Sequence, residues 1–369
     1  MSFVFNNWSK DLNDDLICEL GEKVDFITLP GDRKDKAAWI CSTIVSFFSR
    51  ILLRFVPGHP ALLSYTSFKR SWLLSRAVKK YRGKADFVIA HNPGAFFPAL
   101  QAVKKTGARL GVDVEDYHPG ETNEPDKITK QKSLIRHILP VASYCSYASP
   151  LIAKEIAKDV PGLSSSQLVI LNGFEKTEFL PPMQAEDNSL RFVWFSQYIN
   201  SNRGLENILA FFESLPPLAS LHLIGHMDPT FYERHIKGKN GIVIHPPMAQ
   251  KALHKFLASC HVGLACDLPV NKNRELALTN KLMAYAQAGL HIVATDTKAQ
   301  KEFLNDSGLF FTLTDGSVCS YKKVFDRLLI QCDLLGAQRN KQKIVAEKYD
   351  SNILYQPLVR ILSKSYDGH

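Results

Sequence analysis

Short apolar segments alternate with amphipathic ones along most of the 369-residue chain. Residues 9–23 and 95–105 carry helical patterns in the first half, and LENILAFFESL, QKALHKFLASC and LTNKLMAYAQAG carry them in the second. Strands separated by helices predict βαβ units and parallel sheets. The strand-like segments are SFVFNN, VDFITLP, ADFVIA and ARLGVDV in the first half, and RFVWFSQ, SLHLIG, GIVIHP, HVGLACD, HIVATD and LFFTL in the second.

The alternation is interrupted once, by the polar stretch EKTEFLPPMQAEDNS with its two prolines, which is typical of a linker. A chain of this length is expected to form two domains. The pattern therefore predicts an α/β protein of two doubly wound domains, residues 1–173 and 174–349. The helical tail, residues 350–369, is expected to pack back on one of them, with the first domain as its predicted site.

Composition excludes several classes of protein. With 45% hydrophobic and 22% charged residues, the chain is neither disordered nor collagen-like. Its seven cysteines are an odd number without a CxxC spacing, which argues against a zinc site and a disulfide framework and favours a reduced, cytoplasmic setting. The first residues, MSFVFNNWSKDLNDD, lack the features of a secretory signal.

The second half resembles a known enzyme family. The order NGF, FVWFSQ…NRGLENIL, LIG, ASCHVGLACD and LTNKLMAYAQAGLHIVATD resembles the C-terminal half of GT-B-fold glycosyltransferases, particularly glycosyltransferase family 4. In the first half, DFVIAHNPGAFFPAL resembles the strand-end histidine motif of that family. The resemblance implies two Rossmann-like domains facing a cleft. It also implies transfer of a sugar from a nucleotide-sugar donor, usually with retention at the anomeric carbon.

Cations near two predicted helix starts are candidates for donor binding. A helix N-terminus and a basic side chain are suited to a diphosphate. Thr279 is the expected N-cap of a helix whose first turn holds Asn280 and Lys281; a lysine there is disfavoured by the helix dipole unless an anion is close. Arg203 stands where the family usually has the lysine of Lys-Gly. The alternatives are a solvated Lys281 paired with a nearby acid and an Arg203 that merely belongs to a loop.

His91 is the candidate catalytic residue. It ends the strand DFVIA before a Pro-Gly turn, so its imidazole is expected at the rim of the cleft, near the reacting sugar. A structural histidine that caps the turn is the alternative. Acceptor binding is assigned to Asp113, Glu115 and Asp116 after the strand ARLGV, and to Asn6 in the first loop. The acids could equally cap the next segment.

Three positions depart from the family pattern. Ala284 stands where the family has the second of two spaced glutamates, and Gln197 stands where it often has an arginine. Glu275 lies one residue from the place of the first glutamate, and it either reaches the donor or pairs with Arg274. Ser196 and Gln197 complete the expected donor site, with Gln197 able to hydrogen-bond phosphate but carrying no charge.

One region of the chain accounts for the whole net charge of +9. Between Arg33 and Lys84 there are 12 Lys and Arg residues and one acid, so 12 − 1 gives +11 and the rest of the chain sums to 9 − 11 = −2. The same region holds an apolar helical stripe. It predicts either docking on an anionic membrane surface or a core-facing helix with a solvated basic side. We see no nucleic-acid-binding module. The stripe consists of Ile40, Ile44, Phe47, Ile51 and Phe55.

The sequence thus predicts a metal-independent glycosyltransferase that uses a nucleotide sugar as substrate and needs no cofactor. Its acceptor would be a saccharide or a lipid-linked molecule in cell-surface polysaccharide or glycolipid synthesis. The alternatives are a nucleotide-sugar epimerase on the same fold and a non-catalytic GT-B subunit that binds a glycan or another glycosyltransferase.

Overall fold

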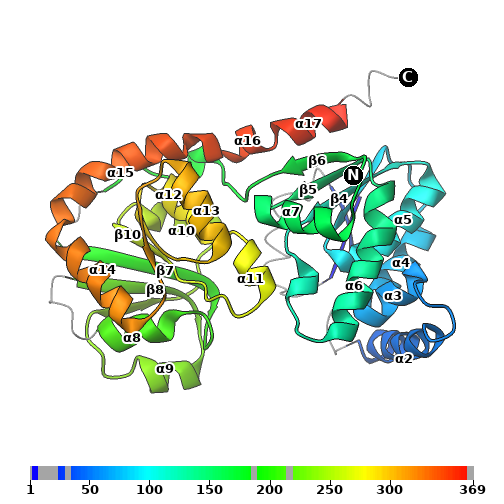
Figure 1. Ribbon diagram of the computed structural model, residues 1–369, viewed down its shortest axis with the longest axis horizontal. Helices are drawn as coiled ribbons and strands as arrows, with labels where there is room; N and C mark the ends of the chain where they lie inside the picture. The colour runs from blue at the N-terminus through cyan, green and yellow to red at the C-terminus, as the bar shows by residue number, and fades with distance from the viewer. Residues whose placement is uncertain (1, 7–23, 30–34, 184–188, 213–218, 364–369) are drawn as a thin grey trace. The chain divides into compact units, whose positions relative to one another are not determined.

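The computed structural model describes residues 2–6, 24–29, 35–183, 189–212 and 219–363 (Figure 1). The chain divides into two compact units: unit 1 is Met1–Val169 with Arg360–His369, and unit 2 is Ile170–Val359. Each unit contains a parallel sheet with helices, so the predicted α/β class with two Rossmann-like domains is confirmed. The sequence placed the boundary after residue 173 and assigned the tail from residue 350, whereas the units divide after Val169 and again after Val359.

The main sheet of unit 1 is parallel, with strand order β3-β4-β5-β6. β1 and β2 form a separate parallel pair among the described residues. β5 was not predicted, because its four residues YCSY do not alternate between apolar and polar and all four are buried. The strands are β1 (Ser2–Asn6), β2 (Asp25–Leu29), β3 (Phe87–His91), β4 (Arg109–Val114), β5 (Tyr144–Tyr147) and β6 (Ser166–Val169).

The helices of unit 1 form successive layers. α5 packs against β3 and β4, α3 and α4 pack against α5, and α2 packs against α3 and α4. α2 is therefore remote from the sheet. The helices are α2 (Lys36–Leu52), α3 (Pro60–Ser67), α4 (Arg70–Lys80), α5 (Pro93–Thr106), α6 (Pro125–Ile138) and α7 (Pro150–Asp159). The helix predicted over residues 9–23 lies outside the described residues.

Unit 2 holds a six-stranded parallel sheet with order β12-β11-β10-β7-β8-β9. The chain runs from β7 toward β9, returns to β10 beside β7, and then runs toward β12. α8, α9 and α14 lie on one face of this sheet and α10, α12 and α13 lie on the other (Figure 1). The strands are β7 (Leu190–Ile199), β8 (Ala219–Met227), β9 (Ile242–His245), β10 (Val262–Ala265), β11 (His291–Thr295) and β12 (Phe311–Thr314).

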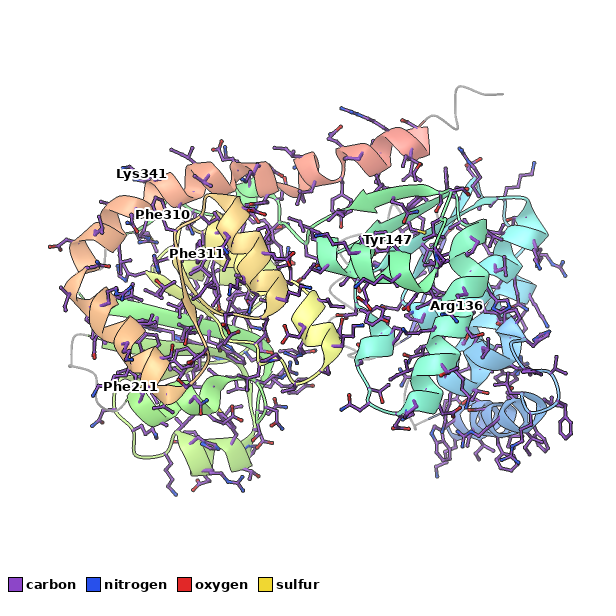
Figure 2. All side chains as sticks on the ribbon, viewed as in Figure 1. Arg136, Tyr147, Phe211, Phe310, Phe311 and Lys341 are labelled. Carbon is purple, nitrogen blue, oxygen red and sulfur yellow. The ribbon has the colours of Figure 1, made fainter. Side chains whose placement is uncertain are left out.

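Aromatic side chains fill the core of unit 2. Trp194 and Phe192 of β7 are buried, and the Phe192 ring lies 4.7 Å from the ring of Phe325 on α14. The ring of Phe211 on α8, labelled in Figure 2, lies 5.8 Å from the ring of Phe325. The helices of this unit are α8 (Leu205–Phe212), α9 (Pro229–His235), α10 (Gln250–Leu257), α11 (Lys272–Leu276), α12 (Asn280–Gln287), α13 (Lys298–Ser307), α14 (Val318–Ile330) and α15 (Cys332–Ala346).

The helical tail predicted from Tyr349 onward is two helices, α16 (Ser351–Leu354) and α17 (Gln356–Ser363). α16 begins at Asp350, whose carboxylate accepts a hydrogen bond from the Asn352 amide. Gly173 contacts this region closely, since a Cβ there would lie 2.0 Å from the Tyr349 carbonyl oxygen. No helix in the described part of the chain is both long and apolar enough to span a bilayer.

Candidate functional site

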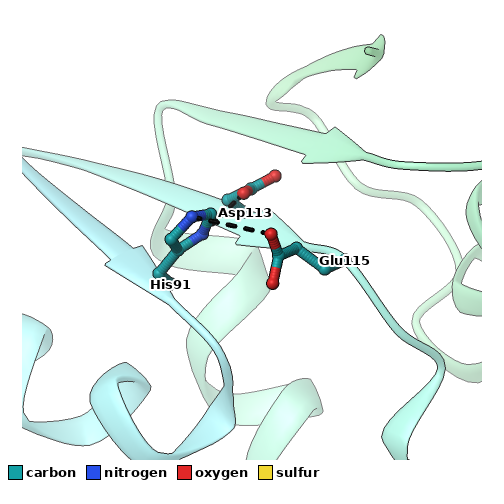
Figure 3. A group of neighbouring side chains, drawn as sticks. All are labelled: His91, Asp113 and Glu115. Carbon is teal, nitrogen blue, oxygen red and sulfur yellow. Dashed lines mark ion pairs between the residues drawn. The ribbon is translucent and has the colours of Figure 1, made fainter. Parts of the chain in front are cut away.

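Two polar clusters lie at the carboxyl ends of strands, one in each unit. In unit 1, β3 ends at His91, which is the register partner of Asp113 on β4. The His91 Nδ1 atom lies 2.6 Å from Asp113 Oδ2, and its Nε2 atom lies 3.7 Å from Glu115 Oε1 (Figure 3). The parallel pairing of β3 and β4 therefore brings together the predicted catalytic residue and two of the predicted acceptor-side acids.

Local structure fixes this cluster on both sides. Asn92, directly after His91, has a φ of 67°, which turns the chain sharply into α5 at Pro93. The Asn92 side-chain oxygen lies 3.2 Å from His118 Nε2. On the far side, the Ser146 hydroxyl on β5 donates to Asp113 Oδ1 at 2.8 Å, so both carboxylate oxygens of Asp113 have partners.

The carboxylates favour a charged His91. The hydrogen bond to Asp113 raises the pKa of His91 above its usual value; partial burial opposes this, and the charges of Asp113 and Glu115 add to it. The His91 side chain is 62% exposed, so it is available to a ligand. An imidazolium here would donate a hydrogen bond from Nδ1–H to Asp113 and leave Nε2–H for Glu115 or a bound oxygen.

The same three residues also have the composition of a metal site. His91, Asp113 and Glu115 offer one ligand atom each, and these atoms lie within 4.8 Å of one another. The short contact between His91 Nδ1 and Asp113 is, however, the geometry of a hydrogen bond, and a metal bound between these two atoms would have to displace its proton. Asp116 follows the cluster and is half-buried. Asn6 ends β1, and its side chain lies outside the described residues.

The second cluster lies where the strand order of unit 2 reverses. β7 and β10 are neighbours, but the chain leaves β7 toward β8 and leaves β10 toward β11. Open α/β sheets bind ligands at this point, outside the carboxyl ends of the strands. Arg203 follows β7, Asp267 follows β10, and Lys281 lies in the first turn of α12.

Asp267 is the centre of this cluster. Arg274 Nη1 donates to Asp267 Oδ1 at 2.8 Å, and Lys281 Nζ lies 3.8 Å from Asp267 Oδ2. Burial alone would raise the pKa of Asp267, but the charges of Lys281 and Arg274 outweigh it and lower the pKa, with smaller contributions from Thr279 and Arg203. Three cations thus share one carboxylate, which leaves the cluster with a net charge of 3 − 1 = +2.

The backbone directly after Arg203 lies close to the end of β10. Gly204 has a φ of 78°, and a Cβ there would lie 1.9 Å from the Cys266 carbonyl oxygen. Glycine is the residue that permits this approach between the end of β10 and the start of α8. The Arg203 side chain is half-buried, and its Nε donates to Asn200 Oδ1 at 3.3 Å, which leaves the terminal guanidinium nitrogens for other acceptors.

The start of α12 combines several of the predicted donor residues. Thr279 is the N-cap, as predicted, but its side chain makes no capping hydrogen bond. Asn280 accepts a hydrogen bond from Asn172 Nδ2 at 2.9 Å. The Lys281 ammonium lies 5.4 Å from the centre of the Trp194 ring, and its side chain is 13% exposed. The expected alternative for Lys281, pairing with an acid, is thus present as a long contact with Asp267.

The remaining predicted residues have separate places. Ser196 and Gln197 lie at the irregularity of β7 between Phe195 and Tyr198; Ser196 is half-buried and Gln197 is exposed. Glu275 Oε2 accepts the Lys298 amide at the start of α13. Arg274, the alternative partner of Glu275, donates to Asp267 instead. Ala284 is fully buried in α12.

Sequence reasoning missed Asp267, Arg274 and Trp194 as parts of this site. Asp267 is the last residue of the predicted strand segment HVGLACD, so its position at a carboxyl end was a usable signal. Its partnership with Arg274 depends on α11, a helix of five residues that periodicity does not detect. Asn271 begins α11 by accepting the Arg274 amide, which directs the arginine back toward Asp267.

Solved structures share this fold. Anabaena Alr3699/HepE, in a complex with UDP, matches with a TM-score of 0.66 and 13% identity over 98% of this chain and 92% of its own. A Rickettsia africae glycosyltransferase matches with a TM-score of 0.64 and 13% identity, over 99% of this chain and 90% of its own. Sucrose-phosphate synthase from Thermosynechococcus elongatus matches with a TM-score of 0.62 and 10% identity, over 82% of this chain and 78% of its own. These likenesses show the GT-B fold. Neither a protein-family model nor a curated protein matches the sequence.

Proposed function

We propose that the protein is a glycosyltransferase that moves a sugar from a nucleotide-sugar donor to a saccharide or lipid-linked acceptor. The observation that carries the proposal is the cluster of Arg203, Arg274 and Lys281 around the single carboxylate of Asp267, at the strand-order reversal of unit 2. An unbalanced positive cluster beside a helix N-terminus is suited to a diphosphate. The UDP and UDP-glucose complexes of Anabaena Alr3699/HepE, which shares this fold, support uridine nucleotides as the first donors to test.

Within this proposal, Asp267 is a positioning residue. It holds Arg274 directly and keeps Lys281 in the same region, so both cations are in place before an anion binds. Preorganised charge stabilises a leaving group better than charge that must be recruited. Arg203 and Lys281 would neutralise the diphosphate as its negative charge grows, and the Thr279–Asn280 amides at the start of α12 would assist.

His91 is the proposed catalytic residue of unit 1. Its pKa is raised by Asp113, so the imidazolium persists at higher pH than usual and serves as a hydrogen-bond donor to a hydroxyl of the reacting sugar. Asp113, Glu115 and Asp116 would accept hydrogen bonds from acceptor hydroxyls. Ser196, Gln197 and Glu275 are proposed as further donor contacts, and Asn6 as a further acceptor contact.

The proposed reaction retains the anomeric configuration. The bond from the anomeric carbon to the diphosphate oxygen breaks, and the acceptor oxygen bonds to that carbon on the same face. The acceptor proton passes to the departing phosphate oxygen, so no protein nucleophile is needed. The cationic side chains supply the charge that a metal would otherwise provide, and we therefore propose a metal-independent enzyme. Its proposed setting is cell-surface polysaccharide or glycolipid synthesis at the cytoplasmic face of a membrane.

A second candidate, a non-catalytic GT-B subunit, is favoured by Ala284. This residue is fully buried, so α12 presents no carboxylate to a donor at that position. The two candidates differ in donor turnover. The purified chain incubated with UDP-sugars should release UDP slowly even without an acceptor, and Lys281→Ala should abolish the release. Saturable UDP binding without any release or transfer would favour the non-catalytic subunit, and an acceptor-independent change in the sugar would identify an epimerase.

A further inference from the structure

Helix α2 presents its apolar side chains outward. The buried residues of this helix are three serines, Ser42, Ser46 and Ser49. Its large apolar residues are exposed, Phe47 by 57% and Phe48 by 56%, and Phe55 just beyond the helix by 76%. The other exposed apolar residues of the segment are Trp39, Ile40, Ile44, Ile51, Leu52 and Val56.

The neighbours of α2 explain why its apolar side chains face outward and its serines face inward. Its neighbours are α3 and α4, whose buried residues are Leu63 and Ser64 on α3 and Ser71 and Ser75 on α4. The Ser64 and Ser71 hydroxyls bond each other at 2.5 Å. The inner side of α2 is therefore formed by small polar side chains, and the large apolar residues of this helix lie outside the interface. In Figure 2, side chains of α2 project away from the rest of unit 1.

The rim of this apolar face is basic. Lys36 and Arg50 lie on α2 and Arg54 follows it, and all three are exposed. The acid of the region, Asp35, accepts the Ala38 amide as the helix N-cap. The charge count of +11 between residues 33 and 84 includes further exposed cations beyond α4. Arg33 and Lys34 lie outside the described residues.

We infer that α2 is a membrane-docking helix that lies flat on an anionic lipid surface, with its Phe and Ile side chains inserted among the acyl chains. A helix with one continuous apolar face and flanking Lys and Arg residues is suited to the bilayer interface. At 17 residues α2 is about 25 Å long. Charge complementarity selects the occupant: anionic headgroups would meet the basic rim, whereas a second copy of the chain would bring two strongly positive regions together.

The experiment is vesicle co-sedimentation of the full chain with phosphatidylcholine alone and with phosphatidylcholine mixed with phosphatidylglycerol. We expect binding to the anionic vesicles and little to the neutral ones. The double variant Ile44→Ser/Phe47→Ser should lose binding, and its matched control is Ile330→Ser/Leu334→Ser, which removes exposed apolar residues of unit 2. Arg50→Glu/Arg54→Glu should weaken binding about fivefold or more for each replaced charge, compared with Lys301→Glu/Lys322→Glu.

Equal loss in the variants and their controls, or no binding to anionic vesicles, would overturn the inference. So would a dimer in solution that disappears in Ile44→Ser/Phe47→Ser without any vesicle binding, because a second copy would then be the occupant. The substituted side chains are exposed, so the variants should keep the far-UV circular dichroism of the parent. The assay uses no nucleotide, and UDP binding by the same samples shows separately whether the proposed donor site holds.

Discussion

The two polar clusters of this protein differ in the sign of their charge. In unit 1, two carboxylates, Asp113 and Glu115, surround one imidazole, whose side chain is 62% exposed. In unit 2, three cations surround one carboxylate, Asp267, whose side chain is 13% exposed. Both clusters lie at the carboxyl ends of parallel strands, so the fold supplies the position and the side chains decide the ligand. The first is suited to hydroxyl groups and the second to an anion.

The largest effect is expected from removing the cations of unit 2. Arg203→Ala and Lys281→Ala should each weaken UDP binding by roughly tenfold to 150-fold, because a hydrogen bond to a charged group contributes about 1.5–3 kcal/mol. Isothermal titration calorimetry measures the change, with Lys322→Ala as the control on an exposed lysine of α14. If both variants bind UDP as tightly as the parent, the cationic cluster of unit 2 is not the site that binds the anion.

The imidazole of unit 1 should matter for turnover and not for free UDP. His91→Ala is expected to lower the rate of sugar transfer by about 100-fold, in the range of a positioned proton donor. UDP affinity should stay within about twofold, since UDP lacks the transferred sugar that His91 would contact. Steady-state kinetics and calorimetry on the same preparation separate these effects. If His91→Ala loses as much UDP affinity as rate, His91 takes part in UDP binding as well, and the separation of transfer in unit 1 from nucleotide binding in unit 2 is wrong.

The buried ion pair should contribute to folding as well as to binding. Asp267→Asn leaves Arg274 without its charged partner, and we expect the free energy of unfolding to fall by about 1–3 kcal/mol. The pKa of Asp267 is lowered, so its contribution is present above the unfolded-state pKa and is lost as the pH falls through the folded-state value. The variant should therefore converge with the parent in acid. Urea denaturation at neutral and acidic pH tests this, and an equal difference at both would contradict it.

The pH profile of turnover should depend on Asp113. The pKa of His91 is raised above its ordinary 6.5, mainly by the hydrogen bond to Asp113. If the imidazolium is the active form, the rate is maximal below that raised pKa and declines as the pH rises through it. Asp113→Asn removes the charge, so the decline should move to lower pH. If the decline occurs at the same pH in Asp113→Asn as in the parent, a group other than His91 controls it.

The smallest effect separates two roles of Glu275. Its Oε2 accepts the Lys298 amide at the start of α13, a capping contact worth about 1 kcal/mol. Glu275→Gln keeps an oxygen acceptor, so thermal stability should hold, whereas Glu275→Ala should lower it. If Glu275 also contacts the donor sugar, both variants should raise the KM for the UDP-sugar. An unchanged KM in both would restrict Glu275 to its structural contact.

Sequence pattern predicted the parallel sheets because buried strands and amphipathic helices alternate visibly. It also placed His91, Asp113, Arg203 and Lys281 at strand or helix ends. It could not show that β3 and β4 pair in the register that brings His91 to Asp113, since register depends on packing. For the same reason it missed the bond between Asp267 and Arg274, whose partners meet through α11.

The apolar stripe of α2 shows a different limit. Periodicity located the stripe correctly but left open whether it faced the core or the surface. The answer comes from the burial of Ser42, Ser46 and Ser49, which form the inner side of α2. A helical period gives the relative directions of side chains, and only the neighbouring elements decide which direction is inward.

The most direct test of the account is the thermal unfolding midpoint of the purified chain with UDP, GDP, ADP and CMP, each alone and with its sugar. We expect a rise with one nucleotide class, reaching about 2.7 kcal/mol of stabilisation when the ligand is at 100 times its Kd. The rise should vanish in Arg203→Ala and persist in Lys322→Ala. No rise with any nucleotide, or a rise that Arg203→Ala leaves unchanged, would contradict the assignment of the cationic cluster to a nucleotide-sugar donor.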